Sequence, residues 1–244
     1  ASTYRAAGNP SPTIRIFFAN VQAYNRSFQP LLDEIAECDP DVVVFVEYNR
    51  RLIQDILAAP HMQQYLLESA VRTRPGGEVA IFSRLPVTEY SYTFAGGRLI
   101  RILDLPLGDQ SLRILAIHNH RPLLEEPDLY AGFWKELTPI VDQSPGPLVV
   151  IGDFNATQHS ADLQHLMGDR LRSAHVDRGR GYAVTWPNGL FPLPPIRIDH
   201  ALLSPEVECL AISEGIGAGS DHKPLVVDLR VHDWSTGRAA AENP

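Results

Sequence analysis

Short apolar runs of strand length alternate with amphipathic stretches along most of the chain. Strands that are buried on both faces have continuous apolar sequences, so such runs predict the central strands of a sheet. The clearest runs are residues 14–19, 42–46, 112–118, 148–151, 198–203 and 225–231. Apolar residues at helical spacing predict helices over residues 28–38, 50–60, 125–141 and 161–167.

The order of these elements predicts the fold class. Strands alternate with helices near both ends of the chain, whereas residues 79–118 contain a run of strands separated by Gly and Pro turns. This mixed order favours an α+β domain with large sheets and helices outside them. The domain is expected to span residues 14–231, between a polar N-terminal arm (1–13) and a small, polar C-terminal tail (232–244).

Composition and charge narrow the functional classes. The chain has 244 residues, 44% hydrophobic and 20% charged, which is typical of a globular protein. Its net charge of -8 argues against a protein that coats nucleic acid, but it allows an enzyme that holds nucleic acid locally through metal ions and a few arginines. Two cysteines, Cys38 and Cys209, are too few for a disulfide framework or a cysteine zinc site.

Localisation stays open at this stage. No apolar run approaches the roughly 20 residues that are needed to cross a membrane, and no signal peptide is visible. The chain begins with Ala1 instead of Met, which fits either a trimmed chain or a secreted or membrane-anchored protein whose leader has been removed. No segment indicates a protein partner, and we expect a monomer.

Polar residues recur where the apolar strands end. Asn20, Glu47, His118 and Asp153 each end or follow such a run. Rigid strand ends can hold side chains in fixed positions against a ligand. Carboxylates and amides suit a hard cation such as Mg²⁺ or Mn²⁺, and histidines suit acid–base chemistry near neutral pH. Any one of these residues could be an ordinary strand end or turn; the series together indicates a site.

The chain resembles the endonuclease/exonuclease/phosphatase superfamily through six groups of residues: Asn20, Glu47, His118, Gly152-Asp153-Phe154-Asn155, Ile198-Asp199-His200 and Ser220-Asp221-His222-Lys223-Pro224. The resemblance covers residues 14–231, and the Gly-Asp-Phe-Asn and Ser-Asp-His-Lys-Pro motifs are its specific part. It implies a four-layer α/β/β/α sandwich of two packed mixed sheets with helices outside. It also implies metal-dependent hydrolysis of phosphodiester bonds at one end of the sandwich.

The resemblance further implies the residues on the metal side of the site. Glu47 is expected to be the principal ligand of Mg²⁺ or Mn²⁺, with Asn20 beside it. Asp221 is expected to be a further carboxylate on the same side. The family usually has Gln before the metal-binding Glu, whereas this chain has Val46, so a contact from that side chain is missing.

The same resemblance implies roles at the phosphate. Asp153 would orient the attacking water, and Asn155 would hold the phosphate. His222 would contact the phosphate as a base or as an electrostatic stabiliser, with Asp199 orienting its ring, as a carboxylate does in other catalytic imidazole pairs. His118 is a candidate acid for the leaving oxygen.

Two details near His118 stay open in the sequence. His120 lies two residues further along, so both rings would lie on the same side if the strand continued. We favour His118 because it ends the apolar run. Glu78 could be a partner of His118, although a solvent-facing position is the simpler interpretation.

The substrate is the least determined part. Residues 166–198 hold five arginines against two aspartates, which could follow a nucleic-acid backbone or belong to a solvated loop. Tyr182, Trp186 and Phe191 in this stretch could stack on bases or pack against the protein. We predict a DNA endonuclease of the deoxyribonuclease-like type, with DNA or another phosphodiester as substrate. The alternative is a phosphatase or phospholipase C-like hydrolase of a phosphorylated lipid, sugar or nucleotide; an inactive binding module is disfavoured because all the motif residues are present.

Overall fold

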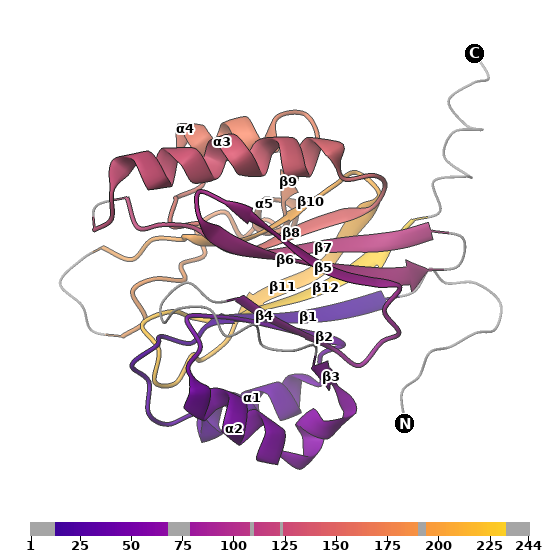
Figure 1. Ribbon diagram of the computed structural model, residues 1–244, viewed down its shortest axis with the longest axis vertical. Coiled ribbons are helices and arrows are strands. Elements are labelled where there is room, and N and C mark those ends of the chain that lie inside the picture. The colour runs from indigo at the N-terminus through magenta and orange to yellow at the C-terminus, as the bar shows by residue number, and fades with distance from the viewer. Residues whose placement is uncertain (1–12, 68–78, 108–109, 123, 190–193, 233–244) are drawn as a thin grey trace.

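Two six-stranded mixed sheets pack face to face in the computed structural model, which describes residues 13–67, 79–107, 110–122, 124–189 and 194–232 (Figure 1). The first sheet has the order β11-β12-β1-β2-β4-β3 and the second the order β5-β6-β7-β8-β10-β9. The first consists of β11 (Val207–Glu214), β12 (Leu225–Val231), β1 (Thr13–Asn20), β2 (Val42–Val46), β4 (Val79–Ser83) and β3 (Leu66–Leu67). The second consists of β5 (Glu89–Ala95), β6 (Arg98–Leu107), β7 (Gln110–His118), β8 (Leu148–Asp153), β10 (Asp199–Leu203) and β9 (Arg172–Ser173).

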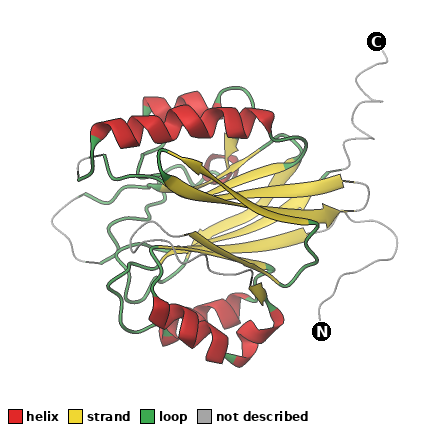
Figure 2. Cartoon of the chain, in the orientation of Figure 1, coloured by secondary structure: helices red, strands yellow, loops and turns green. Residues whose placement is uncertain are grey.

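Helices cover the outer face of each sheet, as Figure 2 shows. Helices α1 (Gln29–Cys38) and α2 (Arg50–Ala58), followed by the 3-10 helix η1 (Pro60–Gln64), pack on the first sheet. Helices α3 (Pro127–Gln143) and α4 (Ala161–Met167) pack on the second, and the short α5 (Ala174–Asp177) follows β9. The fold is therefore the expected α+β sandwich of helix, sheet, sheet and helix layers.

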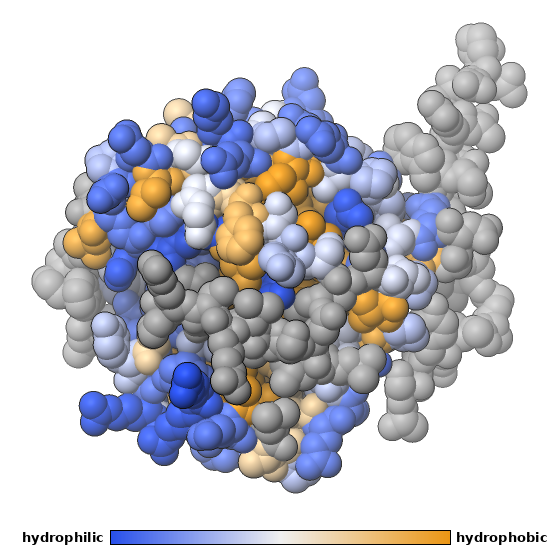
Figure 3. Space-filling view, viewed as in Figure 1, coloured by the Kyte–Doolittle hydropathy of each residue, from blue (hydrophilic) through white to orange (hydrophobic). Residues whose placement is uncertain are grey.

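The main apolar core lies between the sheets, where Ile16 and Val44 of one sheet face the same cluster as Ile114 and Val149 of the other. Their neighbours along each strand point outward to the helices, because successive side chains of a strand alternate between its faces. This explains why the central strands are apolar on both faces. On the surface in Figure 3, by contrast, apolar side chains form small patches among polar ones. None of the helices in the described part of the chain has the length and apolarity to cross a membrane.

Most expected elements are present, with two informative differences. Strand β11 is not among the predicted elements, because its sequence Val-Glu-Cys-Leu-Ala-Ile-Ser-Glu mixes polar and apolar residues, as an edge strand with one exposed face does. Helix α3 continues through Pro139 and ends at Gln143, two residues beyond its predicted end. Pro139 is exposed to solvent, so its ring does not disturb the buried face of the helix. The expected arm and tail lie almost entirely outside the described residues.

Strand register brings the ends of four strands to one end of the sandwich. Strands β1 and β2 run parallel with Asn20 opposite Val46, so Glu47 follows directly beside Asn20. Strands β7 and β8 also run parallel, with His118 opposite Asp153. Asp199 starts β10 opposite Asp153 on the other side. Polar residues from distant parts of the sequence therefore meet at these strand ends.

Candidate active site

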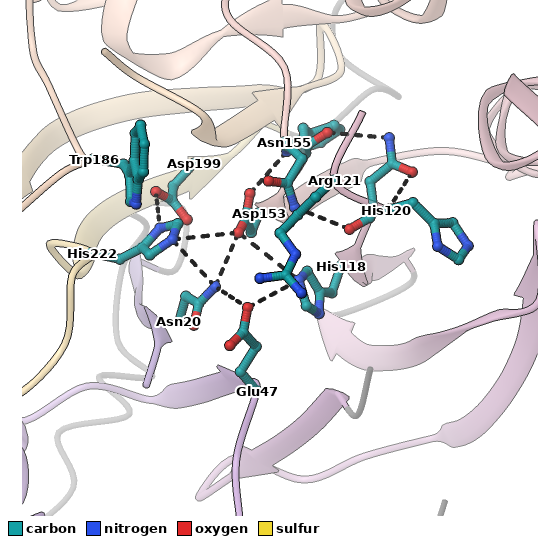
Figure 4. A network of polar contacts seen from close by, with 12 residues as sticks. Asn20, Glu47, His118, His120, Arg121, Asp153, Asn155, Trp186, Asp199 and His222 are labelled. Carbon is teal, nitrogen blue, oxygen red and sulfur yellow. Dashed lines mark hydrogen bonds and ion pairs between the residues drawn. The ribbon is translucent and has the colours of Figure 1, made fainter. Parts of the chain in front are cut away.

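Six side chains converge at this end of the sandwich, with the Asn20 amide at their centre (Figure 4). Its Nδ2 lies 3.1 Å from Glu47 Oε1, 3.0 Å from Asp153 Oδ2 and 3.5 Å from His222 Nε2. The amide oxygen of Asn20 accepts a hydrogen bond from Gln22 N at 3.1 Å, which fixes the nitrogen toward the two carboxylates. Asn20 is therefore a buried donor that joins both sheets at the site.

His222 and Asp199 form a buried ion pair. The ring Nδ1 donates to Asp199 Oδ2 at 2.9 Å, and Nε2 lies 3.8 Å from Asp153 Oδ2. Burial alone would lower the pKa of His222, but the charges of Asp199 and Asp153 outweigh it and raise this pKa to about 10. His222 is therefore an imidazolium near neutral pH, with its Nε2 facing Asn20 and Asp153.

His118 lies on the opposite side of the cluster and differs in its protonation. Its side chain is 2% exposed, and neither ring nitrogen has a hydrogen-bond partner among the described residues. Burial, reinforced by the nearby charges of Arg98 and His222, holds its pKa well below the usual value for histidine. The ring is thus neutral and presents an unused nitrogen 3.5 Å from Glu47 Oε1 and 3.9 Å from Asp153 Oδ2.

These three groups fit a cation. Glu47, His118 and Asp153 each offer one ligand atom, and the three atoms lie within 4.8 Å of one another. Two carboxylate oxygens and a neutral imidazole nitrogen are a donor set that divalent metals accept. A second group, Asp153, Asp199 and His222, has the same spacing, but its imidazole is paired with Asp199 and, as an imidazolium, has no free nitrogen to bind a metal. The unpaired ring nitrogens of His118 make the group on the Glu47 side the better candidate for a metal site.

Asp153 is the most perturbed carboxyl of the cluster. Burial raises its pKa, the charge of Asp199 raises it further, and together they bring it to about 7 despite the opposing charge of His222. Its Oδ1 accepts from Asn155 N at 2.8 Å, which directs Oδ2 toward Asn20. An acid with such a pKa can exchange a proton near neutral pH.

The backbone at Glu47 and Asn155 is unusual. Their φ angles are 55° and 49°, in the left-handed region that residues with a side chain seldom adopt. Asn tolerates this conformation, whereas for Glu it is less common. At position 47 the chain leaves β2 and within two residues reaches Asn49, whose side chain caps α2 by accepting from Leu52 N at 3.0 Å. The positive φ thus turns Glu47 out of the strand at the site.

The remaining residues that the sequence assigned to the site do not all lie in this cluster. Asn155 lies beside the cluster, and its Nδ2 donates to Asn119 O at 3.0 Å. Asp221 belongs to neither group of ligand atoms in the described part of the chain; its Oδ2 accepts from Trp186 Nε1 at 3.0 Å. His120 points elsewhere because β7 ends at His118, and its Nε2 lies 2.7 Å from Gly96 O. Glu78 lies outside the described residues.

The basic stretch is largely engaged within the protein. Four of its five arginines donate to neighbouring side chains or carbonyls: Arg170, Arg172, Arg180 and Arg197. These bonds favour the interpretation that residues 166–198 form an ordinary surface loop over the alternative that their arginines bind a nucleic-acid backbone. Of the three aromatic residues considered there, Tyr182 is 100% exposed, Trp186 is bound to Asp221, and Phe191 lies outside the described residues.

Two supporting residues were not assigned from the sequence. Ser220 donates to Asn20 O at 2.7 Å and accepts from His222 N at 3.1 Å, so it ties the His222 loop to the end of β1. Asn119 donates to Phe154 O at 3.1 Å and ties the loop after β7 to the Asp153 turn. Ser220 is visible in the Ser-Asp-His-Lys-Pro motif, but its partners become known only from the fold.

The sandwich and its acid–imidazole cluster define a hydrolase that acts on phosphodiester bonds. The chain belongs to the Endonuclease/Exonuclease/phosphatase family, whose model matches residues 17–222. Members of this family generally depend on a divalent metal, in agreement with the ligand atoms at Glu47, His118 and Asp153. No protein with a curated description matches the sequence.

Solved structures share the fold at low sequence identity. A Danio rerio TDP2 complexed with single-strand DNA product superposes with a TM-score of 0.73 and 17% identity, over 90% of this chain and 99% of that chain. An endonuclease/exonuclease/phosphatase from Bacteroides vulgatus gives 0.70 and 17%, over 91% and 100%. A family protein from Beutenbergia cavernae gives 0.67 and 18%, over 90% and 72%. At these identities the likeness establishes the fold.

Proposed function

We propose that this protein is a Mg²⁺- or Mn²⁺-dependent phosphodiesterase that cleaves DNA as an endonuclease. The observation that carries the chemistry is the contrast between the two histidines. His222 is held as a cation by Asp199, whereas His118 is neutral and turns an unused nitrogen to Glu47 and Asp153. One side of the site thus suits an anionic phosphate, and the other suits a metal ion.

Different residues of the site would bind the metal ion and contact the phosphate. Glu47, Asp153 and His118 would hold the metal, with Asn20 orienting the carboxylates, and Asp221 remains a candidate at longer range. When bound, the ion supplies positive charge for the developing charge on the oxygens of the phosphate. Asn155 keeps one amide hydrogen free of the Asn119 carbonyl, which suits a contact with the phosphate.

Asp153 would orient the attacking water and accept its proton as the new bond to phosphorus forms. His222 would donate its Nε2 proton as a hydrogen bond to a phosphate oxygen; a pKa of about 10 favours the electrostatic role over that of a base. A neutral His118 is better suited as a ligand than as an acid for the leaving oxygen.

DNA is supported as the substrate by two observations. The TDP2 neighbour holds a single-strand DNA product. Tyr182 and Tyr24, which lies four residues after Asn20, are 100% and 88% exposed, and exposed aromatic rings on fixed loops suit stacking on bases. The loop of Tyr24 is held by Asn49, whose Nδ2 donates to Ala23 O at 2.9 Å.

The second candidate is a phosphatase or phospholipase C-like hydrolase of a small phosphorylated compound. It is favoured by one observation: four of the five arginines that could have followed a nucleic-acid backbone are bonded within the protein. Such a substrate would need only the few cations at the site itself.

A substrate panel tests the proposal. Plasmid DNA, single-stranded oligonucleotide, bis(p-nitrophenyl) phosphate, sphingomyelin and inositol phosphates are incubated with Mg²⁺ or Mn²⁺. We expect plasmid nicking that EDTA and Glu47→Gln abolish and that the exposed helix variant Glu37→Gln leaves unchanged. Inert DNA together with hydrolysis of a lipid or sugar phosphate selects the second candidate. Nicking that survives both EDTA and Glu47→Gln contradicts the metal assignment.

A further inference from the structure

Arg121 extends from the loop that follows β7 toward the Glu47–His118 side of the site, as Figure 4 shows. Its side chain is 55% exposed and makes no hydrogen bond to the described residues. Its nearest carboxylate oxygen is Glu125 Oε1, 3.6 Å from Nε. That carboxylate is already bound by Arg98, whose Nη2 lies 2.8 Å from both of its oxygens. The guanidinium of Arg121 therefore keeps its donors available.

The backbone of Arg121 is fixed from the side of the catalytic turn. Asn119 N donates to Asp153 O at 2.9 Å, and Asn155 Nδ2 donates back to Asn119 O at 3.0 Å. The Asn119 side chain donates to Phe154 O and accepts from His120 N at 2.7 Å. Three of these bonds tie Asn119 to the turn that contains Asp153, and the fourth joins Asn119 to His120, the residue before Arg121.

The other side of the loop is fixed as well. His120 Nδ1 lies 2.6 Å from Glu125 Oε2, and the Arg121 carbonyl accepts from Leu124 N at 3.2 Å and Glu125 N at 3.1 Å. Exposed arginines are commonly solvated surface residues on ordinary loops. Arg121 differs because an exposed side chain starts from a backbone that is bonded on both sides and lies next to a catalytic strand end.

The charges of the site suggest what Arg121 could do there. Three carboxylates, Glu47, Asp153 and Asp199, lie near the point where an anionic substrate must arrive. His222 supplies positive charge on one side of Asn20, and Arg121 reaches over the side of His118 (Figure 4). The charge of Arg121 contributes to lowering the pKa of His118, which agrees with their proximity. A planar guanidinium binds phosphate oxygens through two parallel hydrogen bonds.

We propose that Arg121 binds an oxygen of the reacting phosphate from the Glu47–His118 side, opposite His222. This role rests on the proposed phosphodiester chemistry, since it names a further substrate contact of the same site. The contact is to the reacting phosphate itself, so it is required for small substrates as well as for DNA.

Two measurements on four proteins test this role. The wild type, Arg121→Ala, Arg121→Lys and the control Arg51→Ala are compared; Arg51 is an arginine of α2 whose side chain is 63% exposed. Steady-state hydrolysis of bis(p-nitrophenyl) phosphate gives kcat/KM, and calorimetric titration with inorganic phosphate in the presence of Mg²⁺ gives an affinity that does not depend on turnover. Circular dichroism and thermal melts verify that each variant is folded.

We expect Arg121→Ala to lower both kcat/KM and the affinity for phosphate by roughly 10- to 100-fold, because a charge-assisted hydrogen bond is lost. Arg121→Lys should recover part of each, and Arg51→Ala should match the wild type. A wild type that binds phosphate through Arg121 but hydrolyses no phosphodiester keeps this inference and rejects the proposed function. Unchanged affinity in folded Arg121→Ala, or no phosphate binding by the wild type, overturns the inference. A loss confined to oligonucleotides also overturns it, because Arg121 would then contact a neighbouring phosphate.

Discussion

Gly152 passes so close to Ile117 that a Cβ atom at position 152 would lie 2.1 Å from the Ile117 carbonyl oxygen. The two residues are register partners in the parallel pair of β7 and β8, one position before His118 and Asp153. Only glycine allows this approach. The glycine of the Gly-Asp-Phe-Asn motif therefore permits the close approach of two strands whose next residues belong to the candidate active site.

Replacing this glycine should damage both stability and activity. We expect Gly152→Ala to lower the free energy of unfolding by roughly 2–4 kcal/mol, because backbone atoms must move to relieve the overlap. Activity should fall further than stability accounts for, since His118 and Asp153 shift with the strands. Urea denaturation and turnover under folded conditions measure the two effects. Gly132→Ala in α3 is the control: its Cβ would meet nothing closer than 3.9 Å, so unchanged or slightly higher stability is expected.

The His222–Asp199 pair predicts a pH dependence of activity. Because Asp199 helps raise the pKa of His222, Asp199→Asn should lower that pKa. The protonated ring is the active form in our proposal, so the fall in activity at alkaline pH should begin at lower pH in the variant. We expect kcat near neutral pH to drop by roughly 10²- to 10⁴-fold. The control is Asp162→Asn, an exposed acid of α4. An unchanged alkaline limb would argue against the charged state of His222.

His200 predicts a loss of stability in acid. The ring is buried, its Nε2 donates to Ala156 O at 2.8 Å, and burial lowers its pKa from 6.5 to about 3. The folded protein thus binds this proton less readily than the unfolded chain does. The neutral ring of His200 therefore contributes to the free energy of unfolding in full above pH 6.5. This stabilisation is lost as the pH falls toward 3, by up to about 1.4 kcal/mol per pH unit.

The measurement is the free energy of unfolding between pH 7 and 4. His200→Gln should be less stable than the wild type at pH 7, but its stability should fall less steeply with acid. His159→Gln changes an exposed histidine and should follow the wild-type curve. Equal slopes in the wild type and His200→Gln would mean that this histidine does not determine the acid sensitivity.

Divalent metal should stabilise the folded chain. A ligand that binds the folded state at about 100 times its Kd adds roughly 2.7 kcal/mol to the free energy of unfolding. We therefore expect Mg²⁺ or Mn²⁺ to raise the Tm by several degrees, with the Asp153 carboxyl deprotonated on binding. Glu47→Gln should abolish the increase, and Glu37→Gln should retain it. An equal increase in Glu47→Gln would place the ion elsewhere.

Much of this fold could be predicted because β1, β2, β7 and β8 are buried on both faces. Their continuous apolar sequences locate the strands, and the polar residues at their ends locate the site. Edge strand β11 could not be predicted in the same way, since only one of its faces is buried. Its mixed sequence carries no comparable signal.

Side-chain partners could not be derived from the sequence either. Asp221 follows a motif serine and precedes His222, yet its carboxylate is taken by Trp186, 35 residues earlier. Four of the five arginines of residues 166–198 likewise donate to carbonyls or acids far away in the sequence. Arg121 shows the converse, because its availability follows from Arg98 and His120 binding Glu125 first. Such outcomes depend on competition between groups that only the folded chain brings together.

Asn20 ends a strand of one sheet and Glu47 directly follows another, whereas His118, Asp153 and Asp199 belong to strands of the second sheet. If all of these residues are needed for hydrolysis, as we propose, turnover depends on how the two sheets are packed against each other. A mild denaturant or a core substitution that changes the packing between the two sheets should abolish activity while the hydrogen bonds within each sheet persist. Loss of activity ahead of loss of secondary structure would then be a property of the architecture itself.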